Sequence, residues 1–189
     1  MGKIIISENV SLDGVVQDPT GEEGFRYGGW FLRVTDKDRV EWTKVATEEA
    51  LSAEAWLLGR RSYEFFAARW QSRTGQLADR LNSLHKYVIS STLEKPTWNN
   101  TTVLKGDAVN EVSQLKQKIK RDIVVPASNQ LVQALMEHDL ADEIRLMIYP
   151  YVCGAGNRLF GETSNKKQMR LIEVKSVGDN LAFLTYEFA

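Results

Sequence analysis

The chain has little of what marks several large classes of protein. Its 189 residues include one cysteine, Cys153, so no intramolecular disulfide can form and the cytoplasm is the expected location. The longest apolar run, from Leu146 to Cys153, is far shorter than the roughly 18 residues of a membrane-spanning helix, so no membrane partner is expected. The two histidines, His85 and His138, lie far apart in the sequence, and no metal site is expected.

Charge of one sign is also missing, because 24 Lys and Arg balance 25 Asp and Glu to a net charge of −1. Without a broad positive field the chain has no general means of holding a polyanion, so nucleic acid is not an expected partner. The hydrophobic share of 43% is ordinary for a globular protein, and the length suits one domain over residues 1–189.

Short apolar runs recur along the chain and predict buried strands. They are Ile4–Ile6, Trp56–Leu58, Tyr87–Ile89, Thr102–Leu104, Ile123–Val125 and Ile144–Tyr149. Helical spacing of apolar residues predicts helices between some of them, around 63–70 and 112–119, and Thr35, Asp107 and Ser128 are candidate N-caps.

The end of the chain follows a different pattern. Residues 182–188 alternate between apolar and other side chains, and Gly178-Asp179-Asn180 connects them to the preceding stretch 171–177, which predicts an antiparallel hairpin. The expected fold class is therefore a three-layer α/β/α architecture, with a mixed, mostly parallel central sheet that ends in this hairpin.

The most informative turn follows the predicted strand at 56–58. Gly59, Arg60, Arg61 and Ser62 stand where that strand gives way to a helix, and two guanidinium groups beside a helix N-terminus favour an anion such as phosphate. The alternative is that both arginines lie on a solvated face and Ser62 caps the helix.

Two further turns have a similar position. Ser90 and Ser91 follow the strand at 87–89, and their hydroxyl groups could donate to phosphate or sugar oxygens or could stabilise the turn. Pro126 and Ala127 lead from another buried strand into a second helix N-terminus. Ligands of open α/β sheets usually bind at such strand ends.

The first predicted strand leads into Ser11, Asp13 and Gly14. Asp13 could orient a substrate or support proton transfer, or it could belong to a simple Asp-Gly turn. Gly154 and Gly156 begin like a dinucleotide fingerprint, but Leu159 stands where the third glycine belongs, so a standard Rossmann site is excluded.

Six segments in this order resemble the dihydrofolate reductase-like family that includes the C-terminal reductase domain of bacterial riboflavin biosynthesis. They are S-L-D-G at 11–14, L-L-G-R-R-S-Y-E at 57–64, K-Y-V-I-S-S-T-L at 86–93, D-I-V-V-P-A-S-N-Q-L at 122–131, D-L-A-D-E-I-R-L at 139–146 and G-A-G-N-R-L-F at 154–160. The resemblance implies a dihydrofolate reductase-type fold, NADPH as hydride donor, a small heterocyclic substrate and a homodimer.

The resemblance also implies roles for individual residues. Phosphates of NADPH would lie against the turn from Gly59 to Ser62, the 2′-phosphate near Ser90 and Ser91, and the nicotinamide under a loop with Gly14. The helix start that receives the pyrophosphate would comprise Ser128, Asn129, Gln130 and Leu131. The substrate side would comprise Ser11, Asp13 as the catalytic carboxyl, Gly154 and Gly156.

One departure from the family pattern leaves two functions open. Relatives commonly have glycine where this chain has Pro126-Ala127, and proline has no N–H to donate. The leading hypothesis is an NADPH-dependent reductase of a pteridine- or pyrimidine-like compound, similar to 5-amino-6-(5-phosphoribosylamino)uracil reductase. The alternative is a non-catalytic ligand-binding or regulatory protein on the same fold. The apolar stretch Ile144–Cys153 is the predicted contact of the homodimer.

Overall fold

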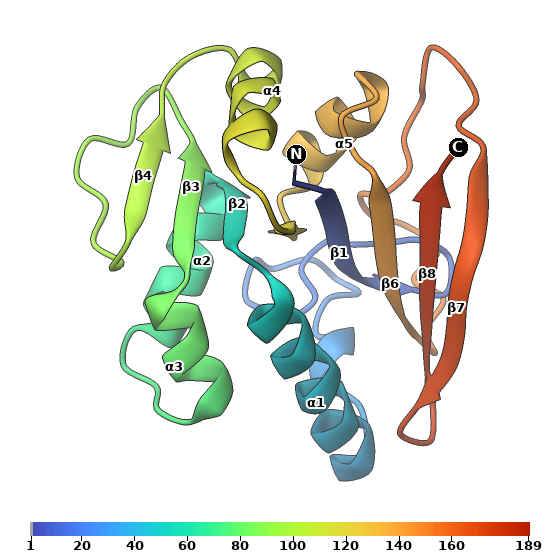
Figure 1. Cartoon of the computed structure of the whole chain (residues 1–189). Coiled ribbons are helices and arrows are strands. Elements are labelled where there is room, and N and C mark those ends of the chain that lie inside the picture. Colours follow the sequence, from blue (N-terminus) through green and yellow to red (C-terminus); the bar gives the residue numbers. More distant parts are fainter. Residues whose placement is uncertain (1) are drawn as a thin grey trace.

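The computed structural model describes residues 2–189, which form one sheet in the order β4-β3-β2-β5-β1-β6-β8-β7 (Figure 1). The strands are β1 (Ile4–Ser11), β2 (Ala55–Gly59), β3 (His85–Ile89), β4 (Thr101–Leu104), β5 (Ile123–Pro126), β6 (Glu143–Tyr149), β7 (Met169–Val177) and β8 (Leu181–Phe188). Strands β1 to β6 pair in parallel, whereas β8 pairs antiparallel with both β6 and β7. The mixed sheet and its terminal hairpin are as predicted.

Helices cover both faces of this sheet. They are η1 (Trp30–Leu32), α1 (Asp36–Ser52), α2 (Arg60–Trp70), α3 (Gln76–Ser83), α4 (Ala108–Lys118) and α5 (Asn129–Glu137). Ile4 and Ile6 of β1 pack in one apolar cluster with α4 and α5, whereas Ile5 packs in another with α1, α2 and α3. Because neighbouring side chains of a strand point to opposite faces, these two clusters establish the three layers.

Each predicted strand is confirmed, but the connections are less regular than simple alternation. Helix α3 follows α2 without a strand between them, and a loop rather than a helix joins β3 to β4. Trp98 of this loop is buried, and its backbone N–H donates to the Tyr63 hydroxyl at 2.9 Å. A buried indole therefore covers this part of the sheet in place of a crossover helix.

Two of the three predicted N-caps act as caps. The Thr35 side chain accepts the N–H of Asp38, the Asp38 side chain accepts the N–H of Thr35, and Asp107 accepts the N–H of Asn110. These contacts satisfy N–H groups that a helix start otherwise leaves unpaired. Ser128 occupies the N-cap position of α5, but its side chain caps nothing in that helix.

Asp38 also fastens α1 to the C-terminal hairpin. Its carboxylate is fully buried and accepts the N–H groups of Asp179 and Asn180, at 2.6 and 3.0 Å, and the Asn180 amide. Burial opposes ionisation, but these hydrogen bonds outweigh it and hold the pKa of Asp38 well below its usual range. Gly178 has φ +65°, and a Cβ there would lie 2.3 Å from the Asp38 carboxylate, so the turn needs glycine.

The predicted dimer contact at Ile144–Cys153 stays a prediction, but the fold encloses much of it. Residues 144–149 belong to β6, which pairs with β1 on one side and β8 on the other. Ile144 and Tyr149 are buried, whereas Ile148 is half-buried and Val152 is exposed, so a partner could reach only part of this stretch. Among the helices of residues 2–189, none has the length and apolar character needed to cross a membrane.

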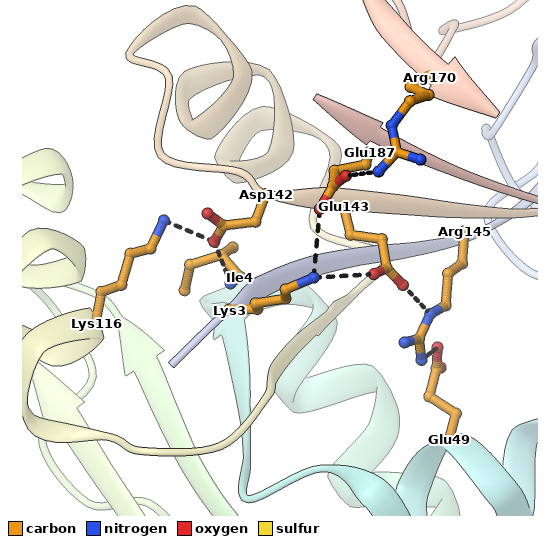
Figure 2. A network of polar contacts seen from close by, with 9 residues as sticks. All are labelled: Lys3, Ile4, Glu49, Lys116, Asp142, Glu143, Arg145, Arg170 and Glu187. Atoms are coloured by element: carbon orange, nitrogen blue, oxygen red, sulfur yellow. Dashed lines mark hydrogen bonds and ion pairs between the residues drawn. The ribbon is translucent and has the colours of Figure 1, made fainter. Parts of the chain in front are cut away.

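Ion pairs join the elements at the amino end of β1 (Figure 2). Glu143 pairs with Lys3 at 3.9 Å and with Arg145 at 2.7 Å, and Arg145 reaches Glu49 of α1 at 3.1 Å. Burial raises the pKa of Glu49, and Arg145 opposes this effect. These charged groups are matched within the fold, which indicates a structural role for this end of the sheet.

Candidate functional site

The carboxyl ends of β2, β5 and β1 lie side by side, because these strands are parallel neighbours in the sheet. They end at Gly59, Pro126 and Ser11. The turns after β2 and β5 meet directly, since the Gly59 N–H donates to Ser128 Oγ at 3.0 Å. Two turns that are 69 residues apart in the chain therefore form a single corner.

The helices that leave this corner have open N-termini. Gly59 is the N-cap residue of α2 and Ser128 that of α5, and neither helix has a side-chain cap. The alternative in which Ser62 caps α2 therefore does not occur. The first N–H groups of both helices are free to donate to an anion, and the helix dipoles favour negative charge at the same place.

The turn before α5 has an unusual backbone. Ala127 and Ser128 both lie in the left-handed region, with φ of 51° and 65°. Non-glycine residues pay for this conformation, and such residues cluster at functional sites. The chain thus keeps, with alanine and serine, a backbone shape that glycine adopts at no steric cost.

Arg60 and Arg61 begin α2 and extend in different directions. Arg60 contacts Glu64 at 2.8 Å and the Thr92 hydroxyl at 2.6 Å, which directs it toward the turn after β3. Arg61 is the more exposed of the two and lies 3.6 Å from Glu23. Both guanidinium groups remain at the rim of the corner and are held only by surface contacts.

The serines after β3 divide between the two predicted roles. Ser90 is buried, and its hydroxyl accepts the N–H groups of Thr92 and Leu93 at 3.3 and 3.0 Å. This contact stabilises the turn, as one interpretation predicted. Ser91 is exposed, and together with Thr92 and Arg60 it forms a polar surface beside the corner.

The first residues of α5 also differ from one another. Asn129 donates from Nδ2 to the carbonyl of Arg158 at 3.3 Å, and its Oδ1 is buried without a partner. Gln130 is exposed, whereas the Leu131 side chain is buried in the core. Leu131 can therefore serve a ligand only through its backbone.

Asp13 joins two loops at the end of β1. One carboxylate oxygen accepts the Ser11 hydroxyl at 2.7 Å and the N–H of Cys153 at 3.0 Å, and the other accepts the N–H of Gly154 at 2.8 Å. Arg158 donates to the backbone carbonyl of Asp13 at 3.1 Å. Asp13 is thus more than part of a local turn, because it holds a segment 140 residues away.

The electrostatics of Asp13 follow from these contacts. The Ser11 hydroxyl and the N–H groups of Cys153 and Gly154 outweigh partial burial and lower the pKa of Asp13 to about 2. Asp13 is therefore an anion at neutral pH. Its predicted catalytic role stays a prediction, and the geometry favours a role in positioning the loops.

The glycines of these loops have positive φ values, which are 85° for Gly14, 74° for Gly154 and 110° for Gly156. A Cβ at Gly156 would lie 2.8 Å from the Phe25 ring, so this position also needs the space that glycine leaves. The resemblance assigned Gly14 to the loop over the nicotinamide and Gly154 to the substrate side, and the structure brings their loops together through Asp13.

Sequence reasoning missed the loop of residues 17–29. Asp18 organises it, since its carboxylate accepts the N–H groups of Glu23 and Phe25 at 3.1 and 3.0 Å. Glu22 pairs with Arg69 and Glu23 with Arg61, which ties the loop to α2. An aspartate followed by several glycines was a signal for an ordered loop, but its partners on α2 had no signal.

Glu8 is the second residue that sequence reasoning missed. It lies inside β1, is 6% exposed, and its Oε1 is buried without a hydrogen-bond partner. An acidic residue inside an otherwise apolar strand start was the available signal. Among residues 2–189, no group of three or more His, Cys, Asp or Glu side chains could hold a metal ion.

The comparisons with known proteins match this arrangement of elements. The model of the RibD C-terminal domain family covers residues 2–183. The chain belongs to this family. The Bacillus subtilis (strain 168) protein YyaP is 22% identical over 98% of this chain and 95% of its own length.

Three solved structures have a similar fold. A Shewanella sp. PV-4 protein named for riboflavin biosynthesis has a TM-score of 0.78 and 22% identity, with 99% of both chains covered. The Thermotoga maritima diaminohydroxyphosphoribosylaminopyrimidine deaminase/5-amino-6-(5-phosphoribosylamino)uracil reductase has a TM-score of 0.65 and 15% identity, over all of this chain and 57% of that one. Enterococcus faecalis dihydrofolate reductase has a TM-score of 0.60 and 13% identity, over 99% and 96%. The fold is therefore dihydrofolate reductase-like, as predicted.

Proposed function

We propose that this protein is an NADPH-dependent reductase of a small heterocyclic compound. The observation that carries the proposal is the corner at which Gly59 and Ser128 meet and two uncapped helices begin. Membership of the RibD C-terminal domain family supports a reductase.

The donors at this corner fit a dinucleotide. Free N–H groups of α2 and α5 would hold the diphosphate, and Arg60, Ser91 and Thr92 would hold the further phosphate of NADPH. When bound, NADPH supplies the hydride, which is the difficult chemistry of the reaction. Ser62 and Gln130 would add side-chain donors, whereas the Ser128 hydroxyl donates to Pro126 and the Asn129 amide to Arg158, so these two would contribute through their backbone.

On the substrate side, the loops that Asp13 joins would place a flat ring beside the end of β1. The proposed substrate side would be lined by Ser11, Gly14, Gly154 and Gly156. Asp13 would hold the loops that carry these residues in one geometry. A fixed geometry accelerates a reaction because the entropy cost of orienting the reacting groups has already been met when the substrate binds. We propose 5-amino-6-(5-phosphoribosylamino)uracil, the compound in the name of the Thermotoga enzyme, as the first substrate to test.

A titration with NADPH, followed by tryptophan and nicotinamide fluorescence, tests the proposal directly. We expect saturable binding, and Arg60→Ala or Arg61→Ala should weaken it by about 1.5–3 kcal/mol, the value of a charge-assisted hydrogen bond. Arg170→Ala on the distant strand β7 is the control and should bind as the wild type does. The absence of any response at millimolar NADPH would refute the proposal.

One observation favours the second candidate, a ligand-binding protein without catalysis. Pro126 has no N–H group, and the two residues after it adopt a backbone that glycine prefers. If the site has lost its cofactor, Pro126→Gly should gain NADPH binding that the wild type lacks. Tight binding by the wild type would exclude this candidate.

The homodimer remains a further proposal. Since β6 is internal, we place the contact on exposed apolar residues of β7, Leu171, Ile172 and Val174. A molar mass from light scattering at high protein concentration decides between monomer and dimer.

A further inference from the structure

The central strand β1 has a gap on one side near the site. It pairs with β6 as far as Ser11, but with β5 only from Ile4 to Ser7. The β5 partner of Ser7 is Pro126, after which the chain turns into α5. The residues from Glu8 to Ser11 therefore have no ladder partner on the β5 side, where the chain continues into the Ala127–Ser128 turn.

Glu8 is the first residue of β1 beyond the last pair with β5. Its side chain points to the same face of the sheet as Ile6 and Val10, which pack in one apolar cluster with Leu131 of α5 and Leu146 of β6. The carboxyl group is thus enclosed between the central strands and the first turn of α5. Burying it without a partner for Oε1 is costly, and such exceptions in a native structure call for an explanation.

Among residues 2–189, no charged group offsets the effect of burial on the pKa of Glu8. The neighbours named above on β1, β6 and α5 are apolar, and on β5 the adjacent residue is Pro126. Burial alone raises the pKa of Glu8 to about 8, so the group carries a proton at neutral pH.

The other carboxyl groups near the end of β1 differ from Glu8 because they have hydrogen-bond partners. Asp13 accepts three hydrogen bonds and Asp18 accepts two backbone N–H groups. Asp13 has a pKa near 2 and cannot supply a proton at neutral pH. Of these carboxyl groups, Glu8 is therefore the one that carries a proton at neutral pH.

We propose that Glu8 is an acid of the cofactor site whose carboxyl group faces the nicotinamide end of the bound dinucleotide. The inference rests on the proposed function. With the diphosphate at the corner and the adenosine phosphate toward Arg60 and Thr92 on the β3 side, the nicotinamide must extend the other way, toward β1. Glu8 is the first residue of β1 on that side that has no β5 partner.

The charge of the ring provides the test. Oxidised nicotinamide is a cation and reduced nicotinamide is neutral, so ionised Glu8 favours NADP⁺ and neutral Glu8 does not. We expect the ratio of the NADPH to NADP⁺ dissociation constants to rise at least about threefold between about pH 7 and pH 9.5, as Glu8 loses its proton. Other titrating groups that change both dissociation constants by the same factor leave this ratio unchanged.

Two variants give the comparison. Glu8→Gln keeps the shape but cannot ionise, so its ratio should not change with pH. Glu48→Gln, on an exposed position of α1, should retain the wild-type dependence. If Glu8→Gln fails to fold, proton release by the wild type on NADP⁺ binding, measured by calorimetry in two buffers, replaces it.

The outcomes separate this inference from the proposed function. If neither NADPH nor NADP⁺ binds, the proposed function fails and the role of Glu8 fails with it. If both bind and the ratio is constant with pH, or Glu8→Gln keeps the wild-type dependence, only the assignment of Glu8 is overturned.

A measurement without ligand checks the protonation itself. A carboxyl group with a raised pKa binds more protons in the folded than in the unfolded state, so its contribution to stability falls as pH rises from its ordinary value toward 8. The urea midpoint of the wild type should therefore fall relative to that of Glu8→Gln over this range. Parallel pH profiles would show that Glu8 is ionised throughout and would overturn the proposal.

Discussion

The starts of α1 and α4 differ from those of α2 and α5. Thr35 and Asp107 satisfy N–H groups of the first pair, whereas Gly59 and Ser128 leave those of the second pair without a side-chain partner. Both helices of the second pair begin at the single corner where Gly59 meets Ser128. The difference marks this corner as the place where two helix starts lack side-chain caps, which supports the anion site that we propose there.

Helix α3 limits this comparison. It also lacks a side-chain cap, but Gly75 at its start is exposed, so water can satisfy its N–H groups. A missing cap therefore points to a ligand only where strand ends and other donors converge.

The largest effect is expected at α1. Asp38→Ala removes the reciprocal cap and the bonds to the hairpin turn, and buried N–H groups lose their acceptor, so unfolding should become about 3 kcal/mol easier. Urea unfolding measures this. Asp36→Ala, in the same turn but exposed, should cost less than about 1 kcal/mol.

From the lowered pKa of Asp38 we also expect the folded protein to lose stability at acidic pH. Its pKa is lowered in the folded state, so its contribution is complete above the ordinary pKa of an aspartate and is lost as pH falls below that value. Asp38→Asn should show a smaller loss of stability in acid than the wild type. Equal losses would contradict the role given to this carboxylate.

The cap of α4 is worth less, because Asp107 serves only its own helix. Asp107→Ala should lower the free energy of unfolding by about 1 kcal/mol. The matched change Ser62→Ala in α2 should cost less than about 0.5 kcal/mol, since Ser62 caps nothing. A cost at Ser62 equal to that at Asp107 would remove the distinction between the two groups.

The strained turn before α5 should respond in the opposite direction. Ala127→Gly relieves a positive φ and should stabilise the protein by about 1 kcal/mol. Ala134→Gly, in the interior of the same helix, should destabilise it by about 1 kcal/mol. Thermal or urea unfolding of both variants shows whether the strain is real.

The smallest effect sharpens the comparison most. Gln130→Glu puts a carboxylate in the first turn of α5, which should add about 0.5 kcal/mol of stability and weaken NADPH binding several-fold. Gln76→Glu at the start of α3 should add a similar stability and leave NADPH binding unchanged. Equal effects of both on NADPH would place the phosphates elsewhere.

Much of the fold could be predicted because its causes are local. The apolar runs at 4–6 and 123–125 reflect strands covered on both faces, and Thr35 and Asp107 act within three residues of their own positions. The connection from β3 to β4 could not be predicted, since a loop with the buried Trp98, rather than a helix, covers the sheet there.

The site was less accessible to sequence reasoning, because its decisive contacts join distant segments. The turns with Gly59 and Ser128 were recognised one by one, but their hydrogen bond depends on the strand order. The partners of Asp13 follow β6, far along the chain, so local reasoning left a functional role and a simple turn open and could not show these contacts. The state of Glu8 depends on what packs over β1, which no local pattern specifies.

The position of β1 has a consequence for how the protein is made. Strand β1 is synthesised well before its sheet neighbours β5 and β6, which begin at Ile123 and Glu143. Ile4, Ile5 and Ile6 must therefore wait for most of the chain before they are enclosed. Pairing between strands that are distant in sequence slows folding and leaves hydrophobic surface exposed during synthesis. Nascent chains that stall before β6 should therefore depend on chaperones.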